Sequence, residues 1–342
     1  MPKTKQINIF VGLSQNQVDN FELVIKQTGI EHEHNILLTS SSISYNPQIY
    51  KEVYQADISF DNQSGNTFQA IRNIHQKIRA YKKLIQKIKS FKSEKKIRVY
   101  FSYIEDVLSN HMVLSFNKNT RAIVVEDGIL NYYMHTIHNL PRHKILLKYL
   151  ISNLNGVRFK FYKGHSSGID YAHVEKQYVR LPELSVKPEK SEKLQVPPIF
   201  IENFSDSAII IGKEELEGKI GSEQYYSKMN LLFDKAIELA KNKKIKKIYY
   251  KPHRHGKRLS EEFIKTKLQS IPYEILNASA PLENLFFNQL RSKYIIGFNS
   301  SAIINIKIQL KNANELKTYV FMEKDDILRN LFKKLNSNIL EM

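Results

Sequence analysis

Residues 7–17 read Ile-Asn-Ile-Phe-Val-Gly-Leu-Ser-Gln-Asn-Gln, an apolar run that leads into a helix start. The run Ile7 to Val11 has the length and composition of a buried strand. Ser14 and Gln17 have the spacing of a capping box, and apolar residues then recur at helical spacing at Val18, Phe21, Val24 and Ile25. A second apolar run follows at residues 36–38, so the chain is predicted to begin with a βαβ unit.

The same alternation of short apolar runs and helical patterns continues along the chain. Further strands are predicted at residues 56–60, 97–102, 122–125, 158–162, 208–211, 245–250, 294–298 and 318–322. Apolar stripes at spacings of three and four predict helices over residues 71–91 and 226–241. The predicted fold class is α/β, with two Rossmann-like domains facing a central cleft, where the carboxyl ends of parallel strands bind ligands.

The chain has 342 residues, which is too long for one ordinary core and suits two domains. Residues 183–193 are polar, charged and flanked or interrupted by proline, as is typical of a linker. We therefore predict two domains, an N-terminal one over residues 1–184 and a C-terminal one over residues 195–342.

Composition excludes several classes of protein. Hydrophobic residues make up 42% and charged residues 25%, which is close to a soluble globular average. No apolar run reaches the roughly 18 residues that a spanning helix needs, and the first residues lack the features of a secretory signal. A cytoplasmic location is expected, which includes the inner face of the cell membrane. The absence of cysteine excludes a thiolate nucleophile and a thiolate metal site.

The charge is strongly basic and unevenly distributed. Lys and Arg number 52 against 34 Asp and Glu, which gives a net charge of +18. Residues 62–93 and 128–169 contain no acidic residue, and both stretches belong to the first half. They predict contact with a polyanionic partner, although lysines that only solvate helix faces would give the same pattern. The candidate residues for this contact are Lys82, Lys83, Arg142 and Lys144.

An acidic pair ends one of the predicted strands. The dinucleotide fingerprint G-x-G-x-x-G and the P-loop are both absent from the sequence. Instead, the run Ile123 to Val125 ends in Glu126, Asp127 and Gly128. Two carboxylates at the end of a buried strand suit a general base and a partner that orients it. An acidic turn without catalytic function is the alternative.

A cationic turn follows a strand in the second half. Residues 251–258 read Lys-Pro-His-Arg-His-Gly-Lys-Arg. Lys251, His253 and Arg254 supply donors for charge-assisted hydrogen bonds to phosphate oxygens. A metal site at His253 and His255 is disfavoured, because the surrounding cations would repel a divalent ion.

Two further helix starts and one glycine carry the remaining candidate residues. Ser300 and Ser301 follow a buried-strand pattern, and their hydroxyl and backbone N–H groups suit an anion at a helix N-terminus. Glu283 follows Ala-Pro-Leu in another helix start, and ordinary capping is the alternative for both helices. Gly212 follows the predicted strand at residues 208–211 and is a further candidate.

The order of these motifs resembles that of the bacterial sialyltransferases of GT-B architecture, which include the lipooligosaccharide and capsular polysialic acid enzymes. That family carries a D/E-D/E-G motif in its first domain, then a histidine-proline motif and a serine motif in its second. Here residues 126–128 read Glu-Asp-Gly, residues 251–254 read Lys-Pro-His-Arg, and residues 300–301 are both Ser. One departure is that Arg254 stands where the family has proline, which puts the identity of the donor sugar in doubt.

The resemblance implies an inverting, metal-independent transfer from CMP-sialic acid to a sugar hydroxyl, with no cofactor. Glu126 would be the general base, and Asp127 would support its loop. His253 would donate to the phosphate of the leaving CMP, with the help of Lys251 and Arg254. In the donor site, Ser300 and Ser301 would hold the phosphate and Glu283 the ribose, and Gly212 would belong to the same site. The resemblance further implies that the C-terminal domain binds the donor and that the N-terminal domain binds the acceptor. The basic candidates Lys82, Lys83, Arg142 and Lys144 would then contact a polyanionic acceptor or an anionic membrane surface.

Two alternatives stay open at the level of sequence. One is a GT-B transferase that uses CMP-Kdo or a UDP or CDP donor. The other is a basic nucleic-acid-binding protein, although no zinc-finger, RRM or KH signature is present. The expected partners are a nucleotide-sugar donor and a glycan acceptor, and no nucleic acid is expected.

Overall fold

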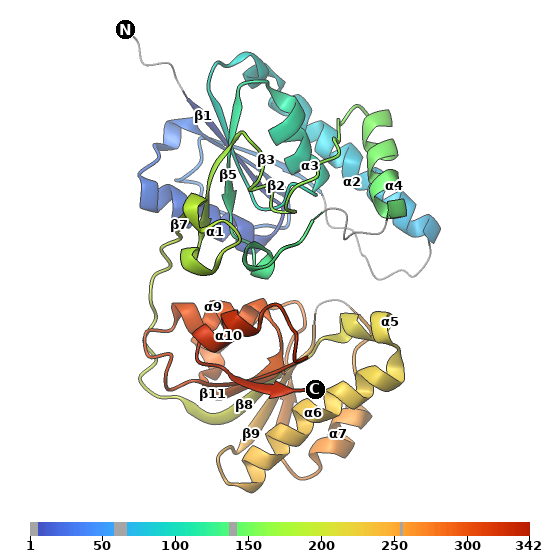
Figure 1. Cartoon of the computed structure of the whole chain (residues 1–342), viewed down its shortest axis with the longest axis vertical. Coiled ribbons are helices and arrows are strands. Elements are labelled where there is room, and N and C mark those ends of the chain that lie inside the picture. Colours follow the sequence, from blue (N-terminus) through green and yellow to red (C-terminus); the bar gives the residue numbers. More distant parts are fainter. Residues whose placement is uncertain (1–5, 58–66, 137–141, 254–255) are drawn as a thin grey trace. The chain divides into compact units, whose positions relative to one another are not determined.

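A computed structural model describes residues 6–57, 67–136, 142–253 and 256–342 (Figure 1). The chain divides into two compact units, Met1–Val196 and Pro197–Met342. The predicted linker lies at the end of the first unit rather than between the two. Its last residues form a strand that pairs with the first sheet, so the boundary falls after it.

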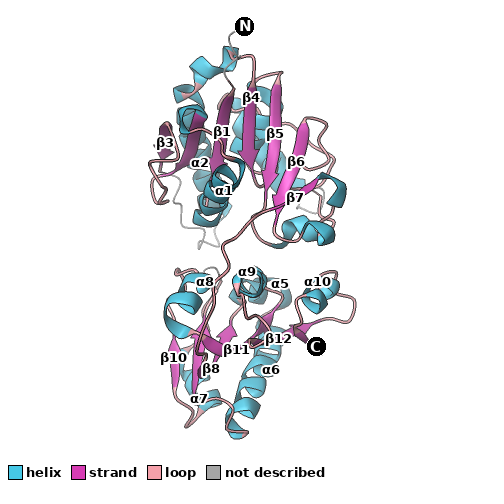
Figure 2. Ribbon diagram, turned by 90° about the vertical axis from the view of Figure 1, so that its left-hand side faces the viewer, coloured by secondary structure: helices cyan, strands magenta, loops and turns pink. Residues whose placement is uncertain are grey.

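The first unit is a seven-stranded parallel sheet in the order β3-β2-β1-β4-β5-β6-β7. Its strands are β1 (Ile7–Gly12), β2 (Asn35–Ser40), β3 (Glu52–Ala56), β4 (Ile97–Phe101), β5 (Thr120–Val125), β6 (Val174–Val179) and β7 (Ser191–Lys193). Its helices are α1 (Gln15–Thr28), α2 (Thr67–Lys87), α3 (Val107–His111) and α4 (Arg142–Leu154). Figure 2 shows helices on both faces of this sheet.

Alternation along β1 explains why both faces are covered. Ile9 and Val11 lie in one apolar cluster with Tyr81 of α2, whereas Phe10 lies in the other cluster with Phe21 of α1. Successive side chains of a strand point to opposite faces, so an uninterrupted apolar strand needs a helix on each side.

The second unit is a six-stranded parallel sheet in the order β10-β9-β8-β11-β12-β13. Its strands are β8 (Ser205–Ile211), β9 (Lys247–Lys251), β10 (Tyr273–Ile275), β11 (Ser292–Phe298), β12 (Lys317–Met322) and β13 (Asn338–Glu341). Its helices are α5 (Glu217–Ile220), α6 (Ser222–Lys241), α7 (Glu261–Leu268), α8 (Leu282–Leu285), α9 (Ser301–Gln309) and α10 (Arg329–Lys334).

Both sheets follow the doubly wound topology, in which the strand order reverses at the centre. The reversal lies between β1 and β4 in the first unit and between β8 and β11 in the second. Ligands of such folds bind beyond the carboxyl ends of the strands beside this reversal. The predicted α/β class with two Rossmann-like domains is confirmed, and each unit has its own candidate binding edge.

Two predicted strands differ in the structure. Residues 158–162 form no strand and pair with no neighbouring strand in the described chain. Side chains bind their backbone instead, since Asn110 accepts from the N–H of Lys160 at 2.8 Å and donates to its carbonyl at 3.0 Å. The strand predicted at 56–60 shares only Ala56 with β3, which spans Glu52–Ala56, and residues 58–60 lie outside the described ranges.

His111, at the end of α3, gives the first unit a predicted sensitivity to acid. The residue is buried, and burial lowers its pKa to about 4 from 6.5. The unfolded chain binds the proton near pH 6.5, so the stability present above that pH is lost as the pH falls towards 4. The expected loss is roughly 3 kcal/mol, as read from urea unfolding at neutral pH and near pH 4.

The variants for this measurement are His111→Gln and, as control, His32→Gln. Gln cannot be protonated, so His111→Gln should flatten the pH dependence of the unfolding free energy. His32 is exposed, so its replacement controls for the effect of a His-to-Gln change elsewhere in the unit. Equal slopes in His111→Gln and the parent chain would contradict the assignment.

Candidate functional site

Glu126 follows β5 and is completely buried, with an exposed fraction of 0%. Its Oε1 accepts from Nη1 of Arg180 at 2.6 Å, and its Oε2 accepts from the backbone N–H of Arg180 at 2.6 Å. The hydroxyl of Tyr132 also donates to Oε2, and burial raises the pKa of Tyr132, which keeps it a donor. The carboxylate that was predicted to be the base is thus held inside the unit by an ion pair.

Asp127, the next residue, is half-buried and points to α1. Its two carboxylate oxygens accept from the side-chain amides of Asn16 at 2.6 Å and Gln17 at 2.7 Å. Gln17 also accepts from the N–H of Leu13 at 2.7 Å, so one side chain connects the loop after β1 to the carboxylate. Asp127 therefore lies at the predicted binding edge, beside the reversal between β1 and β4.

The loop after β4 contacts the backbone of the same residue. The hydroxyl of Tyr103 donates to the carbonyl oxygen of Asp127. Burial and the nearby Asp127 raise the pKa of Tyr103 well above its usual value, so the hydroxyl stays protonated. In the same loop, the carbonyl of Glu105 accepts from Nζ of Lys148 in α4 at 3.2 Å. Asp127 and α4 are consequently attached to one short loop.

In the second unit, Glu214 organises the turn that carries His253. Glu214 is buried and accepts from the hydroxyl of Tyr250 at 2.5 Å and from the backbone N–H of His253 at 2.7 Å. Burial raises the pKa of Glu214, and these two donors oppose that rise. The ring of His253 is 30% exposed, and its Nδ1 lies 3.8 Å from Glu215. His253 thus stands at the carboxyl end of β9 with its backbone fixed.

Two glycines make this arrangement possible. A Cβ on Gly212 would lie 2.5 Å from the hydroxyl of Tyr250 and 2.7 Å from Glu214. Gly256 has φ +98°, and a Cβ there would lie 2.4 Å from the backbone of Glu214. Only glycine leaves room at either position, so Gly212 serves the hydrogen bond between Tyr250 and Glu214.

Lys251 and Arg254 are the two cations expected beside His253. Lys251 is buried, and its ammonium donates to the carbonyls of Ala278 at 2.7 Å and Pro252 at 3.2 Å. These bonds join the end of β9 to the segment after β10. Arg254 lies outside the described residues.

The start of α9 lies after β11, beside the central reversal of the second sheet. Ser300 is its N-cap and accepts from the N–H of Ala302 at 3.3 Å, and Ser301 is the first helical residue. Lys213, after β8, donates to Asn299, and burial lowers the pKa of Lys213. The structure therefore brings a lysine, two hydroxyls and a helix N-terminus to one edge.

Glu283 of α8 lies beside α9. Its Oε1 accepts from the side-chain amide of Asn305 at 2.8 Å. The side chain is half-buried. Among the described residues, helix α9 therefore links Glu283 to Ser300 and Ser301. In the same way, Glu214 links Gly212 to His253.

The basic acceptor candidates lie on helices at the surface of the first unit. Lys82 and Lys83 are exposed on α2, and Arg142 is exposed at the start of α4. Helices α2 and α4 pack side by side. The side chain of Lys144 lies outside the described part of the chain. No contact joins the described members of this group to Asp127.

Several residues of the two edges were not predicted. In the first unit they are Asn16, Gln17, Asn20 and Arg180, and in the second they are Lys213 and Glu214. Gln17 and Asn20 could have been identified from the sequence, because both occupy positions on the apolar face of α1, where they are buried. Polar residues at core positions indicate a buried hydrogen-bond network. No sequence pattern pointed to Arg180, since β6 was itself not predicted.

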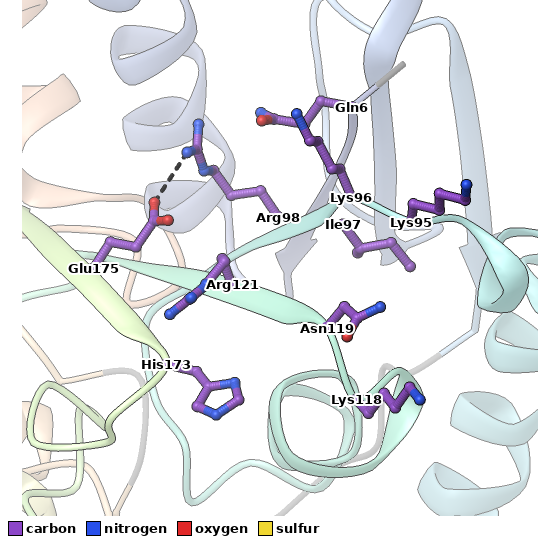
Figure 3. A pocket seen from close by; sticks show the side chains of 10 residues that line it. All are labelled: Gln6, Lys95, Lys96, Ile97, Arg98, Lys118, Asn119, Arg121, His173 and Glu175. Carbon is purple, nitrogen blue, oxygen red and sulfur yellow. Dashed lines mark ion pairs between the residues drawn. The ribbon is translucent and has the colours of Figure 1, made fainter. Parts of the chain in front are cut away.

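A cavity of about 500 Å³ lies away from all of these residues (Figure 3). It is lined by Gln6, Lys95, Lys96, Ile97, Arg98, Lys118, Asn119, Arg121, His173 and Glu175. These residues belong to the amino ends of β4, β5 and β6 or to the segments before β1, β4, β5 and β6, at the opposite end of the sheet from Asp127. Arg98 and Glu175 form an ion pair of 3.0 Å there.

Comparisons with known proteins bear on the activity. A model of the alpha-2,8-polysialyltransferase family matches residues 8–313. An alpha/beta-galactoside alpha-2,3-sialyltransferase from Photobacterium phosphoreum is 12% identical, with 98% of this chain and 99% of that one covered and a TM-score of 0.53. The GT-B domain of a sialyltransferase from Photobacterium damselae is 12% identical, with 98% and 99% covered and a TM-score of 0.50.

A putative UDP-N-acetylglucosamine 2-epimerase from Listeria monocytogenes is similar to a comparable degree, with 10% identity, 98% and 84% coverage and a TM-score of 0.51. No curated protein sequence matches the chain. The structural likenesses therefore establish the two-unit fold, which transferases and epimerases share. The family model spans both units and all the motifs from Asp127 to Ser301. The chain accordingly belongs to the alpha-2,8-polysialyltransferase family and is a sialic acid glycosyltransferase.

Proposed function

We propose that the chain transfers sialic acid from CMP-sialic acid to a hydroxyl of a surface glycan, with inversion and without a metal ion. The observation that carries the proposal is the family match over residues 8–313. The positions of Asp127, His253 and Ser300, each after a strand of a doubly wound sheet, support it. The proposed acceptor is a capsule or lipooligosaccharide chain, or a growing polysialic acid chain.

Asp127, rather than Glu126, is the general base in this proposal. A base has to reach the acceptor hydroxyl and offer it a lone pair. Glu126 is fully buried, and both its oxygens accept hydrogen bonds from Arg180. Asp127 is half-buried, and its two amide donors leave about two of its four acceptor positions. Glu126 then positions the loop, which exchanges the two roles first expected from the sequence.

His253 donates to the phosphate as CMP leaves. Its fixed backbone and partly exposed ring support this role. Lys213 and the N-terminus of α9 add positive charge to the same unit, where negative charge develops in the transition state. Lys251 positions the turn through its bonds to two carbonyls. Phosphate binding by Arg254, Ser300 and Ser301 and ribose binding by Glu283 remain predictions.

The acceptor side of the proposal uses the basic surface of the first unit. A polyanionic chain suits Lys82, Lys83 and Arg142, which are exposed on adjacent helices. Lys144 and contact of this surface with an anionic membrane belong to the same proposal. The expected cytoplasmic location also stays a prediction, which cell fractionation would check.

The donor is tested by thermal-shift titration with CMP, CDP, UMP, UDP and GDP, in the presence of EDTA. A ligand that binds only the folded state stabilises it by about 2.7 kcal/mol at 100 times its Kd. CMP should therefore raise the melting temperature selectively, and His253→Ala should reduce that shift. A metal-independent site should give the same shift when EDTA is replaced by Mg²⁺.

Other outcomes favour the alternatives. A preference for UDP, CDP or GDP would contradict the CMP donor, and CMP-Kdo accepted in place of CMP-sialic acid would change the sugar. A steep salt dependence of DNA binding without any nucleotide shift would favour the nucleic-acid-binding alternative.

A further inference from the structure

Helix α4 carries apolar side chains on both its inner and its outer faces. Ile145 and Ser152 face the core and are buried. On the opposite face, Leu146, Leu150 and Leu154 recur every four residues and are 53%, 47% and 85% exposed. Single exposed apolar residues are ordinary, but three in one row on a helix form a continuous stripe. We call these three residues the leucine stripe.

The apolar surface extends beyond the helix. Phe161 is 58% exposed, and its ring stacks on Tyr149 of α4 with 4.8 Å between the ring centroids. In Figure 1, α4 lies at the periphery of the first unit beside α2. No described element of the unit covers the leucine stripe, whose members are all exposed.

Cations surround this apolar surface, and acids are absent from it. Arg142 begins the helix, and Arg158, Lys160 and Lys163 are exposed in the segment that carries Phe161. The whole stretch from residue 128 to residue 169 has no Asp or Glu. Apolar side chains flanked by Lys and Arg are the pattern of a helix that lies in the interface of an anionic bilayer.

Charge also argues against a second copy of the chain as the occupant. A twofold interface would place the same patch against itself, so the cations of one copy would face the cations of the other. Each copy carries a net charge of +18, which adds to that repulsion. An anionic lipid surface has the opposite sign and accepts the leucines.

We propose that the leucine stripe and Phe161 insert into the interface of an anionic lipid bilayer, with the surrounding cations on the headgroups. None of the helices in the described ranges is long and apolar enough to cross a membrane, so the contact is peripheral. Lys148 of α4 donates to the loop after β4, whose Tyr103 donates to Asp127. Docking through α4 therefore holds the edge that carries Asp127 close to the lipid surface.

The test is cosedimentation of the full chain with vesicles of phosphatidylcholine, alone or mixed with phosphatidylglycerol. The chain should bind the mixed vesicles and not the neutral ones. Leu150→Gln and Leu154→Gln should each weaken binding by about tenfold, since an apolar side chain of this size loses its burial. Gln is a good helix former, so the melting temperature should stay unchanged.

The matched control is Ile327→Gln in the second unit, where Ile327 is 66% exposed. It removes a comparable exposed apolar side chain and should leave vesicle binding as it is. Anionic binding that survives both leucine substitutions would overturn the proposal, because cations alone would then explain it. Failure of the parent chain to bind the mixed vesicles would overturn the proposal too. That conclusion holds whether or not Leu150→Gln changes the molar mass of the chain in sedimentation. The vesicle test uses no nucleotide or acceptor, so its result is independent of the proposed transfer.

Discussion

Asp127→Asn should lower the rate of sialic acid transfer by about 10²–10⁴-fold, the usual contribution of a positioned general base. The substitution keeps the size of the side chain and removes the proton acceptor. Turnover of CMP-sialic acid on an oligosaccharide acceptor measures the loss. The CMP-induced thermal shift should persist, because the CMP site is proposed to lie in the second unit.

Glu126→Gln is the matched comparison. It also neutralises one carboxylate, but it does so in a side chain that is buried against Arg180. Its main expected effect is on stability, with transfer retained in the fraction that stays folded. Full transfer by Asp127→Asn combined with loss of transfer in folded Glu126→Gln would return the base to Glu126.

The central strands of both sheets could be predicted because their signal is local. β1, β4 and β5 in the first unit and β8 and β11 in the second are largely apolar and mostly buried on both faces, and β9 has a buried apolar face. The candidate residues follow these strands, so a parallel α/β topology placed them at one edge of each sheet. The edge strands β7, β10 and β13 were missed, because they are short and partly exposed.

The segment at residues 158–162 was predicted to be a strand and is not one. Its alternation of basic and aromatic residues is what a half-buried strand shows. In the structure Asn110, Asn153 and His111 contact its backbone, which takes the place of a neighbouring strand. That substitution depends on side chains from other parts of the chain, so the period alone could not reveal it.

The sequence also could not show which residue of the acidic pair faces inward. Consecutive residues of an extended chain point to opposite sides, so one of Glu126 and Asp127 had to face inward. The choice is made by Arg180, which binds Glu126 from the end of β6, and by Asn16 and Gln17, which bind Asp127 from α1. The helix positions of the two amides were predicted, whereas the arginine was not.

Arg180→Met should destabilise the first unit by about 3–5 kcal/mol, the usual cost of breaking a buried ion pair from one side. Arg180 is 6% exposed, and it donates to Oε1 of Glu126 at 2.6 Å and to Asn20 at 3.0 Å. Its removal leaves the Glu126 carboxylate buried with fewer donors. The unfolding free energy in urea measures the effect.

The matched control is Arg98→Met, because Arg98 and Glu175 form a pair of 3.0 Å with side chains that are 30% and 34% exposed. An exposed pair contributes about 0–1 kcal/mol, so this variant should stay close to the parent chain. The double variant Glu126→Leu with Arg180→Met should be more stable than Arg180→Met alone, since no charge is then left unpaired. Equal costs for Arg180→Met and Arg98→Met would show that the ion pair does not hold Glu126 inward, and the argument that excludes Glu126 as the base would lose its support.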